Sequence, residues 1–326
     1  MDGLARIRMA APPWHRRSAY GVHTLALGSL LWQGFLWLLI SWQLQRVSIT
    51  PVIESGKWLY LTLLAGVWLV GVLMRLPRLS DAVVAIAVMV LFSIPGLFGQ
   101  YAALSLNLPW ADPWLAHLDE SLGIHMPTVV HWVNAHPTVY NALLIGYASF
   151  LWQVGWVPFL IAVFSRERLW TYVVAYQAAW SLALLGIALL PAECVFVYYN
   201  YPIDMHMIGA EVVADIHRAR MHMPWTLSIG ATNGLVSFPS FHAAVGVLMV
   251  WTMRGRNALS ALVLLMNVLL ILGTAFLGSH YVIDVIASLL MMPAILWAAH
   301  RLTHTAFRET AAPSLAPRPH IQGATA

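Results

Sequence analysis

Long apolar stretches separated by short polar loops run through most of the chain. A helix needs about 17–25 mostly apolar residues to cross the hydrocarbon core of a bilayer. Eight stretches come close to that length, and the sixth is the shortest of them. We therefore predict an all-α, polytopic membrane protein with about eight transmembrane helices. The predicted spans are 22–45, 57–75, 81–104, 138–164, 169–191, 238–253, 258–277 and 281–300.

The composition favours the same class of protein. Hydrophobic residues make up 60% of the 326 residues and charged residues 9%, whereas an ordinary soluble domain has about 25% charged residues. The net charge of +4 comes from basic residues scattered through the loops, without the basic stripe of a nucleic-acid-binding surface. We therefore expect a membrane, and no nucleic acid, as partner. Cys194 is the only cysteine, which excludes an internal disulfide and a cysteine-based metal site.

The basic residues are distributed unevenly between the two sides that alternating spans define. With the N-terminus in the cytoplasm, 13 of the 17 Lys and Arg lie on the cytoplasmic side, as the positive-inside rule requires. This orientation predicts cytoplasmic termini. It places His242 and His280 at the outer face, which is periplasmic, extracellular or lumenal. The cytoplasmic set is Arg6, Arg8, Arg16, Arg17, Arg75, Arg78, Arg166, Arg168, Arg254, Arg256, Arg301, Arg308 and Arg318, and the outer set is Arg46, Lys57, Arg218 and Arg220.

Two short segments at the ends of one helical hairpin carry the chemically most informative side chains. His280 and Asp284 are four residues apart, so on a helix they share a face. A carboxylate there can accept the proton of one ring nitrogen and leave the other nitrogen as a nucleophile. His242 can then act as general acid and base. Pro239 and Ser240 before it predict a helix start, where free N–H groups attract anions.

These segments resemble a known family. Pro239-Ser240-Phe241-His242 resembles the Pro-Ser-x-His motif of the type 2 phosphatidic-acid phosphatase superfamily, and His280-Tyr281-Val282-Ile283-Asp284 resembles its His-x-x-x-Asp motif. The His-Tyr-x-x-Asp form followed by Val285 is more similar to the inositol phosphorylceramide synthase and sphingomyelin synthase branch. Members of that branch move phospho-head-groups between lipids. A weaker resemblance extends upstream through Tyr147-Ala148-Ser149 and Asp112-Pro113-Trp114.

The resemblance implies a division of the chain into three parts. Residues 81–300 are expected to form a six-helix, phosphatase-like catalytic core. Residues 1–80 add a cytoplasmic tail and two extra transmembrane helices. Residues 301–326 are expected to be a disordered cytoplasmic tail, in which Ala, Pro and Thr are frequent from residue 310 onward.

The chain also departs from the wider superfamily, which carries an Arg six residues before the second motif histidine. Thr274 stands at that position here, and no clean Lys-x6-Arg-Pro motif precedes Pro239. The nearest basic residues are Arg218 and Arg220, which we predict to bind phosphate together with Ser240. A phosphodiester carries about one negative charge and a monoester nearly two, so a site with few cations favours a diester.

The sequence therefore predicts a membrane phosphotransferase that is similar to inositol phosphorylceramide synthase. His280 would attack phosphorus, Asp284 would orient it, and His242 would protonate the departing alcohol. The expected partners are a phospholipid donor and either a lipid hydroxyl or water as acceptor, without metal, nucleotide or other cofactor. With water as acceptor, the protein is instead a lipid phosphate or polyprenyl diphosphate phosphatase. A transporter or lipid-binding scaffold with a proton relay is a third alternative.

The two long outer loops contain further acidic and histidine residues. In the first loop, residues 110–132 are expected to form an amphipathic surface helix. In the second, Asp215, His217 and His222 offer oxygen and nitrogen ligands for a metal, but they lack a known metal-binding spacing. We expect that loop to recognise the head group instead. Its other acidic and histidine residues are Glu193, Asp204, His206 and Glu211.

Overall fold

The computed structural model describes residues 13–52, 55–201, 212–228, 234–235, 238–255 and 258–309. Several predictions fall outside these ranges, namely those for Asp204, His206, Glu211, Arg256 and the tail from residue 310 onward. Within the described ranges, eight helices occupy the positions of the eight predicted spans. They are α1 (Pro13–Arg46), α2 (Ser55–Leu73), α3 (Pro77–Leu104), α6 (Pro137–Phe164), α7 (Arg166–Leu189), α10 (Phe241–Met253), α11 (Ala258–Phe276) and α12 (Val282–Glu309).

The predicted all-α membrane class is confirmed. Six of the described helices, α1, α3, α6, α7, α11 and α12, are long and apolar enough to cross a membrane. Helix α10 is apolar but has only 13 residues, about 20 Å of helix at a rise of ~1.5 Å per residue. Helix α2 has 19 residues, of which only some side chains are described. The protein is therefore an integral membrane protein.

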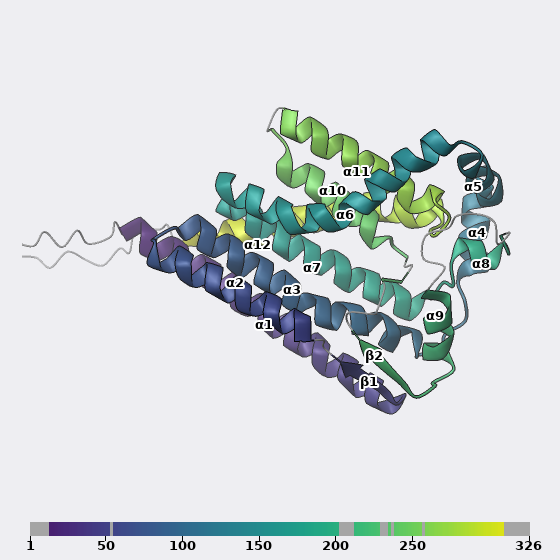
Figure 1. Ribbon diagram of the computed structural model, residues 1–326, viewed down its shortest axis with the longest axis horizontal. Coiled ribbons are helices and arrows are strands. Elements are labelled where there is room, and N and C mark those ends of the chain that lie inside the picture. Colours follow the sequence, from purple (N-terminus) through teal and green to yellow (C-terminus); the bar gives the residue numbers. More distant parts are fainter. Residues whose placement is uncertain are drawn as a thin grey trace, which may run out of the picture.

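The long helices pack around α3 and α7 (Figure 1). Helix α3 contacts α1, α2, α6 and α7, while α7 also contacts α10 and α12. Helix α11 lies against α6 and α10. The large side chains of Trp170, Tyr172 and Phe92 are fully buried between these helices. Helix α10, which carries the first sequence motif, packs against α6, α7, α11 and α12.

Short elements gather at one end of the bundle (Figure 1). Strand β1 (Ile49–Val52), after α1, pairs in parallel with β2 (Trp225–Ser228), with Ile49 opposite Trp225. This pairing connects the chain after α1 to the segment before α10, and the sequence did not predict it. The short helices are α4 (Asp112–Ser121), α5 (Met126–Asn134), α8 (Val195–Tyr198) and α9 (Val213–Arg220).

Two predicted boundaries are wrong. Residues 301–309, expected in a disordered tail, continue α12 to Glu309. Contacts with α7 stabilise this last part of α12. Thr303 Oγ1 lies 2.7 Å from Thr171 Oγ1, and His304 Nδ1 lies 2.9 Å from Glu167 Oε1. The single amphipathic helix expected at 110–132 is two helices, α4 and α5. The chain breaks between them at Gly123, whose φ of 76° suits glycine.

Gly186 in α7 lets the segment before α10 approach the bundle. A Cβ at this position would lie 1.6 Å from the carbonyl oxygen of Phe238 and 2.7 Å from its carbonyl carbon. Both atoms are backbone, so they cannot move aside cheaply. We expect Gly186→Ala to lower enzymatic activity at least ~10-fold and to lower the melting temperature, because it displaces the segment that contains Pro239 and Ser240.

The matched control is Gly155→Ala in α6, where a Cβ meets nothing within 4 Å. That change should leave activity unaltered and stabilise the helix by about 0.5–1 kcal/mol. Activity assays and thermal unfolding of the purified proteins compare the two variants. Equal behaviour of the two would contradict the importance of the close approach at Gly186.

Candidate active site

The second motif forms the start of α12. His280 Nδ1 lies 3.0 Å from Asp284 Oδ2, and both side chains are buried. The same carboxylate oxygen accepts the backbone N–H of Tyr281 at 3.2 Å. Tyr281 immediately precedes α12 and Asp284 is its third residue, so Asp284 makes the return contact of a capping box. The contact predicted from the four-residue spacing is therefore present, and the local geometry of the helix start produces it.

This contact determines the protonation of the His280 ring. With the Asp284 carboxyl ionised, Nδ1 donates its proton to it, which leaves a lone pair on Nε2. Burial lowers the pKa of His280, because the charged imidazolium would lose its hydration. The ring is therefore neutral at pH 7. Its Nε2 lies 3.5 Å from Ser240 Oγ, on the side of the first motif.

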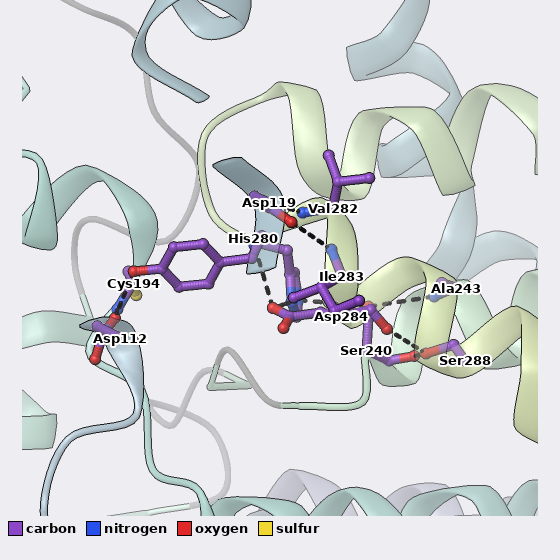
Figure 2. A network of polar contacts seen from close by, with 11 residues as sticks. Asp112, Asp119, Cys194, Ser240, Ala243, His280, Val282, Ile283, Asp284 and Ser288 are labelled. Atoms are coloured by element: carbon purple, nitrogen blue, oxygen red, sulfur yellow. Dashed lines mark hydrogen bonds and ion pairs between the residues drawn. The ribbon is translucent and has the colours of Figure 1, made fainter. Parts of the chain in front are cut away.

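Ser240 joins the two motifs. It is the N-cap of α10, and its Oγ accepts the backbone N–H of Ala243 at 3.4 Å. Its own backbone N–H donates to the carbonyl oxygen of Asp284 at 3.1 Å. Ser288 Oγ then donates to the carbonyl oxygen of Ser240 at 2.7 Å. Figure 2 shows how these contacts hold the start of α10 against the start of α12.

His242 lies in the first turn of α10. Its ring stacks on Tyr147 with centroids 5.0 Å apart and lies 4.4 Å from the ring of Phe150. His242 and His280 line the same small cavity. The cavity wall is otherwise mainly apolar, and α7 contributes Trp180, Ala183, Leu184 and Ile187. The two histidines are thus brought together from separate helices, with aromatic side chains of α6 fixing one of them.

Two buried carboxylates of α4 hold the His280 segment from outside (Figure 2). Asp119 accepts the backbone N–H groups of Val282 and Ile283, each at 2.8 Å. Asp112 accepts the hydroxyl of Tyr281 at 2.9 Å and the backbone N–H of Glu193 at 2.9 Å.

Burial raises the pKa values of Asp112 and Asp119, while the hydrogen bonds that they accept lower them. Sequence reasoning assigned neither carboxylate to the site. The only signal was the weak resemblance at Asp112-Pro113-Trp114.

One of the comparisons with known proteins finds a match that includes both motifs. The family model of the PAP2 superfamily matches residues 113–298, which is more than half of the chain and includes both motifs. The chain belongs to the PAP2 superfamily. Its activity is accordingly of the lipid phosphatase or phosphotransferase type. No curated protein and no solved structure matches the chain.

The two arginines predicted to bind phosphate lie in the last turn of α9 and have other partners. Arg218 Nη1 is 3.0 Å from Asp215 Oδ1 at the surface. Arg220 Nη2 donates to the carbonyl oxygen of Leu108 at 2.8 Å, and its guanidinium lies 3.7 Å above the Trp110 ring. Neither arginine is among the described residues that line the cavity. Their binding of phosphate in this PAP2 protein stays a prediction.

The histidines of the same loop also have partners. His217 Nε2 lies 2.6 Å from Glu193 Oε1, and His222 Nε2 lies 2.8 Å from the carbonyl oxygen of Ser105. Within the part of the chain that the structure describes, no group of three or more His, Cys, Asp or Glu is placed to hold a metal. The described members of the loop therefore support the structure around α9.

Asp119 offers a test of the α4 contacts. Asp119→Asn should lower turnover by roughly 10–100-fold. The hydrogen bonds that the Asp119 carboxylate accepts from two backbone N–H groups stabilise the His280 segment by about 1.5–3 kcal/mol, and the amide would weaken them. Substrate affinity should change little, since Asp119 contacts the backbone at Val282 and Ile283 rather than the cavity. Steady-state kinetics measures both effects.

Glu120→Gln is the matched control for this change. It removes the same charge from the same helix, but Glu120 contacts Tyr199 Oη at 3.2 Å and not α12. Asp119→Glu should recover part of the lost turnover. A loss as large in Glu120→Gln as in Asp119→Asn would show that α4 acts only through its overall charge or stability.

Proposed function

We propose that this PAP2-superfamily protein transfers a phospho-head-group from one lipid to another through a phosphohistidine on His280. The observation that carries the proposal is the buried pair of His280 and Asp284, beside a cavity that His280 and His242 both line. A neutral imidazole with a fixed tautomer is the form that can attack phosphorus.

The first step forms the phosphohistidine. His280 Nε2 bonds to phosphorus, the bond from phosphorus to the lipid oxygen breaks, and His242 gives its proton to that oxygen. Asp284 stabilises the positive charge that develops on the His280 ring. The amides of Phe241 and His242 precede the first intrahelical bond of α10, which runs from Ala244 N–H to the Ser240 carbonyl oxygen. They are therefore open to the phosphoryl oxygens.

The second step reverses the first with another alcohol. The hydroxyl of an acceptor lipid attacks phosphorus, His242 takes its proton, and the bond to His280 Nε2 breaks. The enzyme returns to its starting state with no net change of protons. Water at the same position would give hydrolysis, so the choice of acceptor depends on what reaches the cavity.

The charge and polarity of the cavity favour transfer of a phosphodiester group. No Lys or Arg is among the described residues that line it, and the neighbouring segments 229–233 and 236–237 contain none in sequence. Thr274, at the position of the superfamily arginine, is buried and donates to the carbonyl oxygen of Leu270 at 2.8 Å. An apolar wall with few cations suits a lipid with one negative charge at phosphorus.

Tyr281 supports the narrower assignment to an activity like that of inositol phosphorylceramide synthase. It is the residue that distinguishes the His-Tyr-x-x-Asp form of the motif. Its hydroxyl donates to buried Asp112, so the distinguishing residue has a definite structural role here. A lipid phosphate or polyprenyl diphosphate phosphatase, with water as acceptor, is the alternative, because it would use the same catalytic groups.

A transfer assay decides between them. Purified protein in mixed micelles is given phosphatidylinositol labelled in its phosphate, with ceramide as acceptor. Head-group transfer yields a new labelled phospholipid that appears only with acceptor. Release of labelled phosphate or inositol phosphate alone, at a rate independent of acceptor, would reject the transferase and favour the phosphatase. The His280→Ala variant gives the background.

We further propose that the active site faces the outer side and that the termini are cytoplasmic. The support is the division of the basic residues. Ser121→Cys at the exposed end of α4 and Thr305→Cys at the exposed end of α12 test it, because native Cys194 is buried. An impermeant maleimide applied to intact cells should label the Ser121 site and not the Thr305 site. The reverse pattern would reject this orientation.

A further inference from the structure

A second hollow in the membrane bundle lies away from the catalytic histidines. It is a groove of about 710 Å³ lined by residues of α10, α11 and α12, and its volume falls in the usual range of ~300–1,000 Å³ for ligand pockets. Helix α10 packs against both α11 and α12, whereas α11 and α12 contact each other in few places. The groove is the space between α11 and α12, and α10 forms its floor.

The position of α10 places the groove toward the opposite end of the bundle from His280. Helix α10 begins at the active site with Ser240 as its N-cap and ends at Met253. Its ~20 Å length is shorter than the ~30 Å hydrocarbon core of a bilayer. Helix α12 continues well beyond the groove residue His300 to Glu309. The groove therefore opens toward the leaflet on the side away from the catalytic cavity.

The walls of the groove are apolar along most of its length. Val250 comes from α10, Val268 from α11, and Pro293 and Leu296 from α12. No other part of the protein covers Val268 and the neighbouring wall residue Leu264 completely. Their exposed fractions are 43% and 49%. Side chains of this kind at a membrane-facing groove suit an acyl chain.

One end of the groove is basic. Arg254 and His300 line it together with Trp251. The Arg254 guanidinium lies 3.9 Å above the Trp251 ring, and the His300 ring lies 5.9 Å from the same ring. Arg168 brings a second guanidinium close, because its Nη1 donates to the carbonyl oxygen of Arg254 at 3.1 Å.

The nearest acidic group among the described contacts pairs with His300 and His304 and not with Arg254. Glu167 lies 2.9 Å from His304 Nδ1 and 3.6 Å from His300 Nδ1. The contacts described for Arg254 use Nη1, which donates to the Trp251 carbonyl oxygen. Two arginines beside one another repel, so an anion at this position would remove an unfavourable contact.

We infer that this groove binds an anionic phospholipid, with an acyl chain along Val250, Val268 and Leu296 and the phosphate against Arg254 and His300. Basic pockets between transmembrane helices bind acidic head groups in this way. The rings of Trp251 and Trp297 lie where an apolar chain would meet its polar head, which is the usual place of Trp in membranes. The inference is independent of the proposed transfer reaction, since it involves other residues at the other leaflet.

Quenching of Trp297 by brominated lipids tests the inference. The protein is reconstituted in phosphatidylcholine bilayers that contain a small fraction of either dibromo-phosphatidylglycerol or dibromo-phosphatidylcholine. The difference between the wild type and Trp297→Phe isolates the signal of this tryptophan. We expect apparent binding of the brominated phosphatidylglycerol to be about fivefold stronger, the scale of one basic residue acting on an acidic head group.

Four substitutions complete the test. Arg254→Gln and His300→Gln should each reduce the preference for phosphatidylglycerol, and Arg254→Lys should keep it. Arg78→Gln is the control, because Arg78 lies against α6 at the carbonyl oxygen of Val163 and is not part of this groove. Arg78→Gln removes one positive charge at the same end of the bundle but outside the groove, so this variant should keep the preference for phosphatidylglycerol.

Three outcomes would overturn the inference. Equal quenching by the two brominated lipids would mean that the groove holds bulk lipid without a head-group site. A preference that survives in both Arg254→Gln and His300→Gln would place the anion elsewhere. Absence of quenching by either lipid would mean that protein, such as a second copy of the chain, covers the groove. A wild-type thermal unfolding curve and a single size-exclusion peak verify that each variant is folded.

Discussion

Replacement of His280 by alanine is expected to abolish turnover, with a loss on the order of 10⁶-fold, the scale found when an enzyme loses its covalent nucleophile. The structure orients the ring of His280 through Asp284, and the same side chain lines the cavity. No other described side chain lining that cavity can take its place, since His242 is held against Tyr147 and Phe150.

Trapping of the intermediate measures this prediction directly. Wild-type protein quenched during turnover of a phosphate-labelled lipid should carry acid-labile, base-stable phosphate, and His280→Ala should carry none. His131→Ala, at an exposed histidine of α5, is the matched control and should trap phosphate normally. Trapped phosphate in His280→Ala would refute the assignment of the nucleophile.

Asp284→Asn should be less severe than His280→Ala. The amide keeps the shape of the side chain but can no longer accept the His280 proton as a charged partner, so the ring loses its fixed tautomer. A loss of about 10⁴-fold is known for such a change in a triad. Trapped phosphate should therefore form slowly in this variant instead of being absent.

The parts of the site that depend on near neighbours in the chain were open to prediction from the sequence. The His280–Asp284 contact follows from a four-residue spacing, and the role of Ser240 as N-cap follows from its place before an apolar run. The positions of the membrane spans likewise follow from local hydropathy. These features need no knowledge of how the helices pack.

The contacts that span the fold were not open to prediction in this way. Asp119 is 163 residues from Val282, and Asp112 is 169 residues from Tyr281. In the sequence these carboxylates look like ordinary polar loop residues, because only packing reveals that they are buried. Tyr147 against His242 is a similar case. The end of α12 was misjudged for the same reason, since its contacts with Thr171 and Glu167 come from a distant helix.

Removal of His242 should produce a different defect from removal of His280. General acid–base catalysis contributes roughly 10²–10⁴-fold, so His242→Ala should lower lipid phosphotransfer by about that factor. The effect should depend on the leaving group, because a good leaving group departs without a proton. A substrate with a p-nitrophenol leaving group should therefore still phosphorylate His280 at close to the wild-type rate.

Comparison of two substrates makes this prediction sharp. With a lipid donor, His242→Ala should form little phosphohistidine. With the p-nitrophenyl donor it should accumulate phosphohistidine, because the second step still needs a base to deprotonate the acceptor. His242→Gln is a second variant that keeps a polar side chain near Tyr147 and Phe150, and it should behave in the same way. Equal losses with both donors would mean that His242 supports the structure of the cavity and does not transfer the proton.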